Sequence, residues 1–327
     1  MGYDDDKIDD VTQPSQRSPQ RMPLGFKIPI IAIPLFTVAM LVPGMRSAFL
    51  AALGETYQCT FSRAINAGRF GEDRMRRWAA IRASAQRIQS DENYSLWRTR
   101  DGDFWIPNRN TDALAYNLAE QEQDVYGRGV MGVRSGDVVL DGGANVGVFT
   151  RKALNAGART VVAVEPAPEN VESLRRNFAQ EIASGRVVIQ AVGLWNQPAE
   201  LPLRVDAGNS ARNSFVMDFG PAASTVMVPL RTIDSIVESL ALTKVDFIKL
   251  DIEGAEKNAI AGANQTMARF HPRLAVAMEH LVDDPIAIPA AINSMGLGYV
   301  TICGPCMDYQ SSVRPDTLYF TPRSHGR

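Results

Sequence analysis

A regular alternation of apolar runs and helical stretches after Gly136 is the feature that most restricts the fold of this chain. The apolar runs are short, continuous and rich in β-branched residues, which is typical of parallel strands covered by helices on both faces. They lie at residues 137–141, 160–165, 186–192, 245–251 and 273–279. The stretches between them have helical composition and provide right-handed crossovers. The pattern predicts an α/β fold with a doubly wound, mostly parallel sheet.

Two more apolar runs follow near the C-terminus, at residues 299–303 and 317–322. Because they come close together in the sequence, we expect them to form an antiparallel edge pair. With this pair the predicted sheet has seven strands.

The turn after the first predicted strand is the most specific segment of the sequence. Asp141 ends the strand, and Gly142, Gly143 and Gly147 lie in the turn that opens the next helix. Glycine lets a backbone approach a ligand closely, and ligands of open α/β sheets bind outside the carboxyl ends of the strands. The turn therefore predicts a ligand site, although a plain tight strand-to-helix turn is the alternative.

An acidic residue ends the second predicted strand. Glu165 follows Gly147 by 18 residues, and a carboxylate at this point can accept hydrogen bonds from both hydroxyls of a ribose. A dinucleotide site would want glycine at position 144, where the chain has Ala144. An anion at Asp141 would repel a pyrophosphate but attract the ammonium group of a methionine moiety. These details favour a methionine-bearing nucleoside over a dinucleotide.

Three motifs together resemble the FkbM family of S-adenosylmethionine-dependent methyltransferases. They are D-G-G-A-N-V-G at residues 141–147, E-P at residues 165–166 and K-L-D-I-E-G-A-E at residues 249–256, within a similarity that runs from about Asp101 to Pro322. The resemblance implies a class I methyltransferase fold, which is Rossmann-like, and S-adenosyl-L-methionine as the cofactor. It also implies that the methionine end is held by Asp141, Gly143, Asn145 and Gly147 and the ribose by Glu165. We further predict that the cofactor site includes Gly142, Pro166 and Val192.

An acidic cluster at the same sheet edge supplies candidate catalytic residues. Asp251 ends a predicted strand, Glu253 begins the next helix, and His280 follows Glu279 at the end of the last parallel strand. A hydroxyl acceptor must lose a proton during methylation, so we predict that the catalytic residues are Asp251, Glu253 and His280. Helix capping by Asp251, a helix-dipole role for Glu253 and a hydrogen-bonded wall role for His280 are the structural alternatives. These groups can also gather a divalent cation, but no sequential ligand motif supports one, and we predict no metal.

The first hundred residues lie outside the resemblance. We predict a disordered acidic and polar tail over residues 1–23, an apolar segment over 24–53 and a helical extension over 54–100, before a methyltransferase domain at 101–327. Within the apolar segment, residues 28–45 carry no charge over 18 positions, the minimum for a membrane span, but contain three prolines. A membrane anchor, a cleaved signal peptide and a buried apolar arm are the open interpretations. In the extension, residues 60–97 predict an amphipathic helix.

Charge and cysteine usage limit the other options. The net charge of −2 gives no reason to expect a nucleic-acid partner. Cys303 and Cys306 stand in a C-G-P-C tetrapeptide, which we interpret as a turn bearing two thiols, with redox or metal chemistry as the alternative. The loop at residues 206–215 is interpreted as either a substrate contact or a solvated turn.

The function expected from these features is S-adenosylmethionine-dependent O-methylation of a hydroxyl. Since the resemblance is to a family acting on sugars, polyketides and other natural products, we expect a small-molecule or glycan acceptor. The catalytic domain is expected in the cytoplasm, with membrane association through residues 28–45 if that segment is an anchor. A nicotinamide-dependent oxidoreductase and a membrane-tethered, non-catalytic cofactor-binding module are the alternatives.

Overall fold

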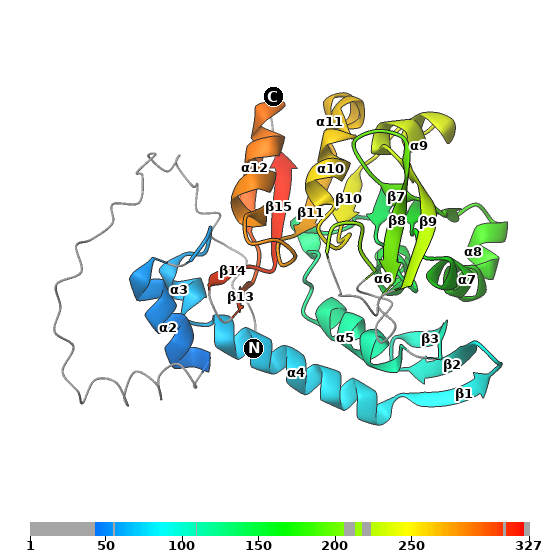
Figure 1. Cartoon of the computed structure of the whole chain (residues 1–327), viewed down its shortest axis with the longest axis horizontal. Helices are drawn as coiled ribbons and strands as arrows, with labels where there is room; N and C mark the ends of the chain where they lie inside the picture. Colours follow the sequence, from blue (N-terminus) through cyan, green and yellow to red (C-terminus); the bar gives the residue numbers. More distant parts are fainter. Residues whose placement is uncertain are drawn as a thin grey trace. The chain divides into compact units, whose positions relative to one another are not determined.

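The computed structural model describes residues 43–54, 56–108, 110–205, 213–217, 224–309 and 312–323. Its main sheet has seven strands in the order β12-β15-β11-β10-β4-β5-β6 (Figure 1). These strands are β4 (Val138–Gly142), β5 (Thr160–Val164), β6 (Val187–Gln190), β10 (Phe247–Leu250), β11 (Arg273–Ala277), β12 (Tyr299–Cys303) and β15 (Thr317–Pro322). The first five run parallel, and β15 is antiparallel to both β11 and β12. The predicted seven-stranded, mostly parallel sheet is confirmed, including its antiparallel pair.

Helices cover both faces of this sheet. They are α6 (Val148–Asn155), α7 (Pro168–Asn177), α8 (Ala179–Ala183), α9 (Ile233–Ser239), α10 (Glu256–Ala261), α11 (Asn264–Phe270) and α12 (Asp284–Ser294). Successive strand residues point to opposite faces, so Leu140 and Ile248 pack in one apolar cluster while Val139 and Phe247 pack in another. Burial on both faces explains why the strand sequences are continuously apolar.

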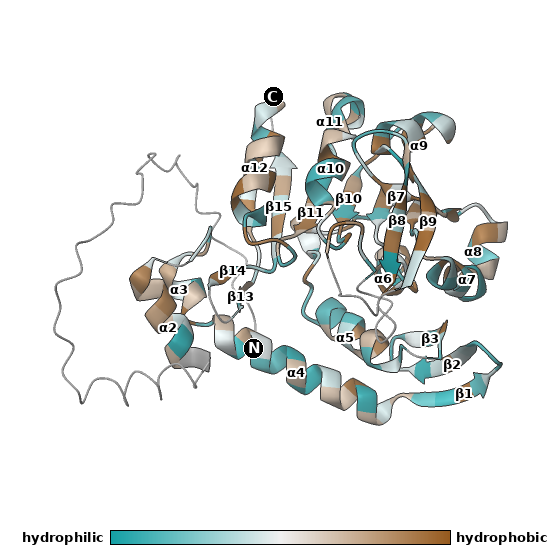
Figure 2. Ribbon diagram, in the orientation of Figure 1, coloured by the Kyte–Doolittle hydropathy of each residue, from teal (hydrophilic) through white to brown (hydrophobic). Residues whose placement is uncertain are grey.

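The N-terminal part of the described chain contains fewer helical residues than its sequence suggests. After α2 (Pro43–Leu53), α3 (Phe61–Ala64) and α4 (Ala67–Ser84) come three strands, β1 (Gln86–Ser90), β2 (Tyr94–Thr99) and β3 (Gly102–Pro107). The predicted helix over residues 60–97 is therefore wrong beyond Ser84. The β2–β3 pairing sets Trp97 opposite Phe104, which is fully buried, so packing of aromatic residues outweighs the helical periodicity. Figure 2 shows hydrophilic and hydrophobic residues mixed along α4.

The remaining elements flank the main sheet. They are α5 (Thr111–Glu122), the single turn η1 (Gly129–Met131), and the small sheets formed by β7 (Gly193–Leu194), β8 (Ala199–Val205) and β9 (Ser224–Arg231) and by β13 (Cys306–Asp308) and β14 (Val313–Pro315).

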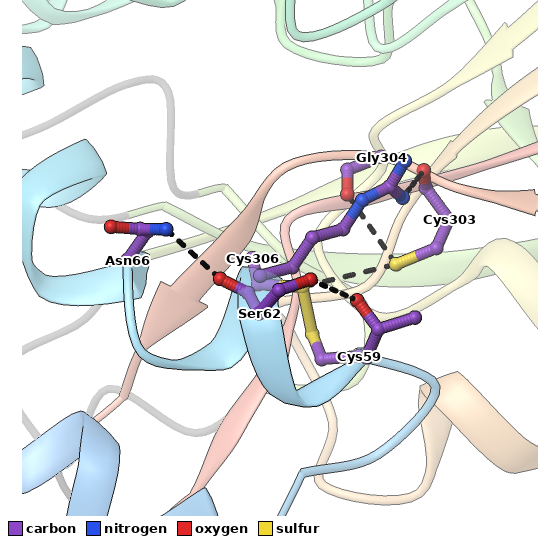
Figure 3. The surroundings of a disulfide bond; sticks show 8 residues. Cys59, Ser62, Asn66, Cys303, Gly304 and Cys306 are labelled. Atoms are coloured by element: carbon purple, nitrogen blue, oxygen red, sulfur yellow. Dashed lines mark hydrogen bonds between the residues drawn. A yellow bond between two sulfur atoms is a disulfide. The ribbon is translucent and has the colours of Figure 1, made fainter. Parts of the chain in front are cut away.

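A disulfide joins Cys59 to Cys306 across 247 sequence positions (Figure 3). The interpretation of C-G-P-C as a turn with two thiols is therefore wrong: Cys306 is oxidised, and only Cys303 of the pair keeps its thiol, 3.8 Å from the Cys306 sulfur. An ion pair between Arg46 of α2 and Asp308 of β13, 2.8 Å long, adds a second link between the N-terminal segment and β13. The segment between α2 and α3 is thus fixed to the C-terminal part of the chain.

The tail at residues 1–23 and most of the uncharged segment at residues 28–45 lie outside the described residues. Within the described ranges, no helix combines the length and hydrophobicity required to cross a bilayer.

Candidate active site

A cavity of about 400 Å³ opens at the carboxyl ends of β4, β5, β10 and β11. Most of the predicted site residues line it together. They are Gly143, Asn145, Glu165, Pro166, Val192, Asp251, Glu253 and His280. Three others, Asp141, Gly142 and Gly147, are buried and are not among the residues that line the cavity.

The turn after β4 is built from residues in the left-handed backbone region. Gly143 has φ +76°, and a Cβ there would lie 1.8 Å from the carbonyl oxygen of Asp251, so only glycine fits. Asn145 has φ 50°, a conformation that asparagine tolerates better than most residues. Gly147 has φ +94°, and a Cβ there would meet the ring of Phe178 at 2.2 Å. Gly143 therefore shapes the turn at the cavity, whereas Gly147 allows close helix packing.

Asp141 faces a cation of the protein itself. The carboxylate is fully buried, accepts a hydrogen bond from the Thr150 hydroxyl at 2.6 Å, and lies 3.3 Å from the Nζ of Lys249. Lys249 also donates to the carbonyls of Gly142 and Gly143, at 3.1 and 2.8 Å. Burial alone would lower the pKa of Lys249, but Asp141 and Asp251 outweigh it and raise this pKa above its usual value. The predicted contact of Asp141 with a ligand ammonium stays a prediction.

Glu165 is held in one orientation at the cavity wall. Its Oε2 accepts the N–H of Asn145 at 2.8 Å, and its Oε1 accepts the N–H of Ala167 at 3.0 Å and the amide of Asn170 at 3.3 Å. Burial raises the pKa of Glu165 to about 7, although these donors partly oppose the shift. A fixed carboxylate whose charge changes near neutral pH thus borders the cavity.

The two predicted acidic catalytic residues lie in different electrostatic environments. Asp251 accepts a hydrogen bond from the Tyr126 hydroxyl at 2.7 Å and lies 3.6 Å from Lys249. Burial opposes ionisation of Asp251, but Lys249 and His280 outweigh it, so its pKa falls below the usual value. Burial dominates at Glu253 and raises its pKa. Asp251 is therefore the more firmly ionised of the two, and Glu253 the better proton acceptor at neutral pH.

His280 lies among carboxylates. Its Nε2 is 3.5 Å from oxygens of both Asp251 and Glu253, and its Nδ1 is 3.0 Å from Glu256. Burial lowers the pKa of His280, but Glu256 and Glu253 outweigh it and raise this pKa well above its usual value. The environment favours the imidazolium, so the predicted role as a base requires that His280 first lose this proton.

Other residues that line the cavity were not singled out by the sequence. Among them are Tyr116, Glu120, Tyr126, Met217 and Lys249. Of these, Lys249 had a usable signal, because a charged residue inside an apolar strand needs a buried partner. The described end of the loop at residues 206–215 reaches the cavity through Asn213 and Phe215.

A family model described as the methyltransferase FkbM domain matches residues 141–296. Among solved structures, the FkbM methyltransferase of Methylobacillus flagellatus has 17% identity and a TM-score of 0.45, over 79% of this chain and 61% of that one. The chain thus spans less than two thirds of that protein's length. No curated protein matches the chain.

Two other structures align with lower TM-scores. A precorrin-6y C5,15-methyltransferase of Geobacter metallireducens has 14% identity and a TM-score of 0.33, over 64% of this chain and 86% of that one. A putative RNA methyltransferase of Pyrococcus horikoshii has 15% identity and a TM-score of 0.30, over 77% and 98%.

The matched residues include the turn after β4, Glu165 and the acidic cluster from Asp251 to Glu256, and they begin at the strand end that borders the cavity. The seven-stranded sheet with its antiparallel β15 is the class I methyltransferase fold. From residue 141 to residue 296, this chain matches the family model of the FkbM methyltransferase domain.

Proposed function

We propose that this protein transfers a methyl group from S-adenosyl-L-methionine to a hydroxyl of a small-molecule or glycan acceptor. The observation that carries the proposal is the meeting of the glycine turn, Glu165 and the acidic cluster around one cavity, inside a domain that matches a methyltransferase family. The cavity volume of about 400 Å³ lies in the range of small-molecule sites.

The cofactor half of the cavity fits a nucleoside. Glu165 would accept the ribose hydroxyls, since its fixed oxygens keep lone pairs that the neighbouring amides do not occupy. The backbone of the turn from Gly143 to Asn145 would border the methionine end, and Val192 would add an apolar contact. When bound, the cofactor supplies an electrophilic methyl group on a sulfonium.

The acceptor half contains the groups that can handle a proton. An acceptor hydroxyl must lose its proton as the new bond to carbon forms. Glu253 is suited to take this proton because burial raises its pKa. Asp251, held by Tyr126, would orient the hydroxyl, and His280 would stabilise the negative charge on Glu253. Tyr116, Phe215 and Met217 offer aromatic and apolar surface for an acceptor.

Calorimetry with S-adenosylhomocysteine and with NAD tests the proposal. We expect the wild-type protein to bind S-adenosylhomocysteine and not NAD. Glu165→Gln should weaken binding by about tenfold or more, since it removes a charged acceptor. Glu200→Gln, at an exposed position of β8, is the matched control and should bind like the wild type. Binding of NAD alone, or of neither nucleoside, would refute the proposal.

The methylated product is the second readout. With labelled S-adenosylmethionine and a panel of hydroxylated sugars and metabolite extracts, we expect transfer of label to oxygen, and a strong loss of transfer in Glu253→Gln. Transfer to nitrogen or carbon would contradict the O-methylation part while leaving cofactor use intact.

A further inference from the structure

We infer that Asp251, Glu253 and His280 form a binding site for one divalent transition-metal cation. Each of these residues lines the cavity and can direct one ligand atom to a common point. The role of such a cation in methyl transfer rests on the proposed function, whereas its binding does not.

The spacing of the ligand atoms suits a metal ion. One oxygen from each carboxylate and Nε2 of His280 all lie within 4.8 Å of one another, and Nε2 is 3.5 Å from each oxygen. In an octahedral shell with bonds of about 2.1 Å, ligand atoms lie about 3.0 Å apart when adjacent and about 4.2 Å when opposite. If the distances between the three ligand atoms shortened by a few tenths of an ångström, the atoms would therefore have the spacing of an octahedral shell.

His280 provides independent support, because its side chain is only 5% exposed and yet its ring is poorly satisfied. Neither ring nitrogen makes a hydrogen bond to any described residue, although carboxylate oxygens lie close by. Buried polar atoms without hydrogen bonds are rare and often mark the site of an ion. A cation that displaces the Nε2 proton would satisfy this nitrogen, which lies near both Asp251 and Glu253.

Glu256 lies close to Nδ1 of His280, the ring nitrogen that would not bind the metal. Its Oε1 is 3.0 Å from Nδ1 of His280 and accepts the N–H of Ile252 at 2.8 Å. Metal-binding histidines commonly direct their other ring nitrogen to a carboxylate, which fixes the tautomer and the ring orientation. Glu256 is therefore a positioning residue for His280 in this proposal.

The charge around the site is strongly negative. Glu279 lies 4.0 Å from Nε2 of His280, and Glu256 and Asp284 are fully buried behind it. Of the nearby cations, Lys249 is shared between Asp141 and Asp251, and Lys257 lies near Asp283 and Asp284. A doubly charged ion would offset this excess, which burial otherwise makes costly.

The donor set limits the kind of ion. Two carboxylate oxygens and one imidazole nitrogen suit Mn²⁺, Fe²⁺ or Zn²⁺ better than Ca²⁺, which prefers oxygen ligands alone. Three protein ligands leave positions for water and for acceptor oxygens, whose pKa the ion would lower. An acceptor with two adjacent oxygen donors would therefore be favoured.

Titration with Mn²⁺ tests the site directly. The electron paramagnetic resonance signal of the free ion measures how much Mn²⁺ stays unbound. Mn²⁺ also avoids the thiol of Cys303, because it prefers oxygen and nitrogen donors. With the full-length, chelator-treated wild type we expect one bound ion per chain. Asp251→Asn and His280→Gln should each weaken binding by about tenfold or more, whereas Glu200→Gln should not change it. Absence of binding, or equal binding in all variants, overturns the inference.

Two controls separate this inference from misfolding and from the proposed function. Thermal unfolding must show that both site variants are folded; if one is not, Glu256→Gln replaces it, and unchanged Mn²⁺ affinity in that variant counts against the site. S-adenosylhomocysteine binding is measured on the same samples. Nucleoside binding without Mn²⁺ binding overturns the metal site alone, and Mn²⁺ binding without nucleoside binding overturns the proposed function alone.

Discussion

Buried charged groups at the two ends of the main sheet differ in how completely they are paired. At the amino end, Arg273 at the start of β11 lies 2.5 Å from Asp137, which precedes β4, and the same carboxylate accepts the N–H of Arg134 at 2.7 Å. At the carboxyl end, Glu165, Glu253 and His280 border a cavity, and the ring nitrogens of His280 lack hydrogen bonds to the described residues.

This difference between the two ends indicates that the groups able to bind a ligand lie at the carboxyl end of the sheet. At the amino end, Arg273 and Asp137 are paired with each other, so this pair contributes to the stability of the sheet. At the carboxyl end the groups are fixed but incompletely satisfied, which costs stability and leaves them free to bind. Substitutions at the amino end should therefore change mainly stability, and substitutions at the carboxyl end should change mainly ligand affinity.

The largest expected effect on stability comes from the amino end. Arg273→Met leaves Asp137 buried without its cation, so we expect a loss of about 3–5 kcal/mol in the free energy of unfolding. Affinity for S-adenosylhomocysteine should stay within about twofold of wild type, since the site is at the other end of the strands. Urea unfolding and calorimetry measure the two quantities.

The exposed pair Arg98–Asp103 provides the matched control. Arg98→Met should leave the free energy of unfolding almost unchanged, because solvent-exposed ion pairs contribute little to stability. If Arg273→Met weakens nucleoside binding as much as it weakens the fold, the two ends are not independent and the comparison fails.

The next effect concerns binding at the carboxyl end. Gly143→Ala forces a Cβ against the Asp251 carbonyl and so displaces the turn. Because a displacement of about 1 Å at a site can cost about 100-fold, we expect at least that loss of S-adenosylhomocysteine affinity by calorimetry.

Gly185→Ala controls for backbone strain alone. Gly185 has φ +73°, close to that of Gly143, but a Cβ there meets no atom within 4 Å. It should lose about 1–2 kcal/mol of stability and no affinity. Equal loss of affinity in both variants would show that strain, rather than the turn, is being measured.

The smallest effect is a pH dependence. Since burial raises the pKa of Glu165 to about 7, its carboxylate is mostly protonated at pH 6 and mostly ionised at pH 8. The ionised form accepts hydroxyl donors better, so nucleoside affinity should rise about tenfold between these pH values. Glu165→Gln should remove the rise; an unchanged pH profile in that variant would assign the effect to another group.

The sequence predicts the parts of the molecule that depend on local patterns. The continuous apolar strands, the antiparallel edge pair and the turn around Gly143 follow from hydrophobicity, spacing and glycine chemistry. Each of these features depends on residues that are close together in the sequence, so it can be predicted without knowledge of the fold.

Features that depend on distant parts of the chain could not be predicted in the same way. The Cys59–Cys306 disulfide joins positions 247 residues apart, and the contact of Tyr126 with Asp251 spans 125. Strands β1 and β2 were missed because pairing between strands, such as that of Trp97 with Phe104, determines them rather than local propensity. The partner of Asp141 was missed for the same reason, as Lys249 comes from another strand.

The most direct test of the central claim is a comparison of S-adenosylhomocysteine with its 2′-deoxy analogue, in the wild type and in Glu165→Gln. If Glu165 holds the ribose in this cavity, the wild type should lose about tenfold or more in affinity for the analogue, and Glu165→Gln should lose little further. An equal loss in both proteins, or no binding of the nucleoside to the wild type, would contradict the claim.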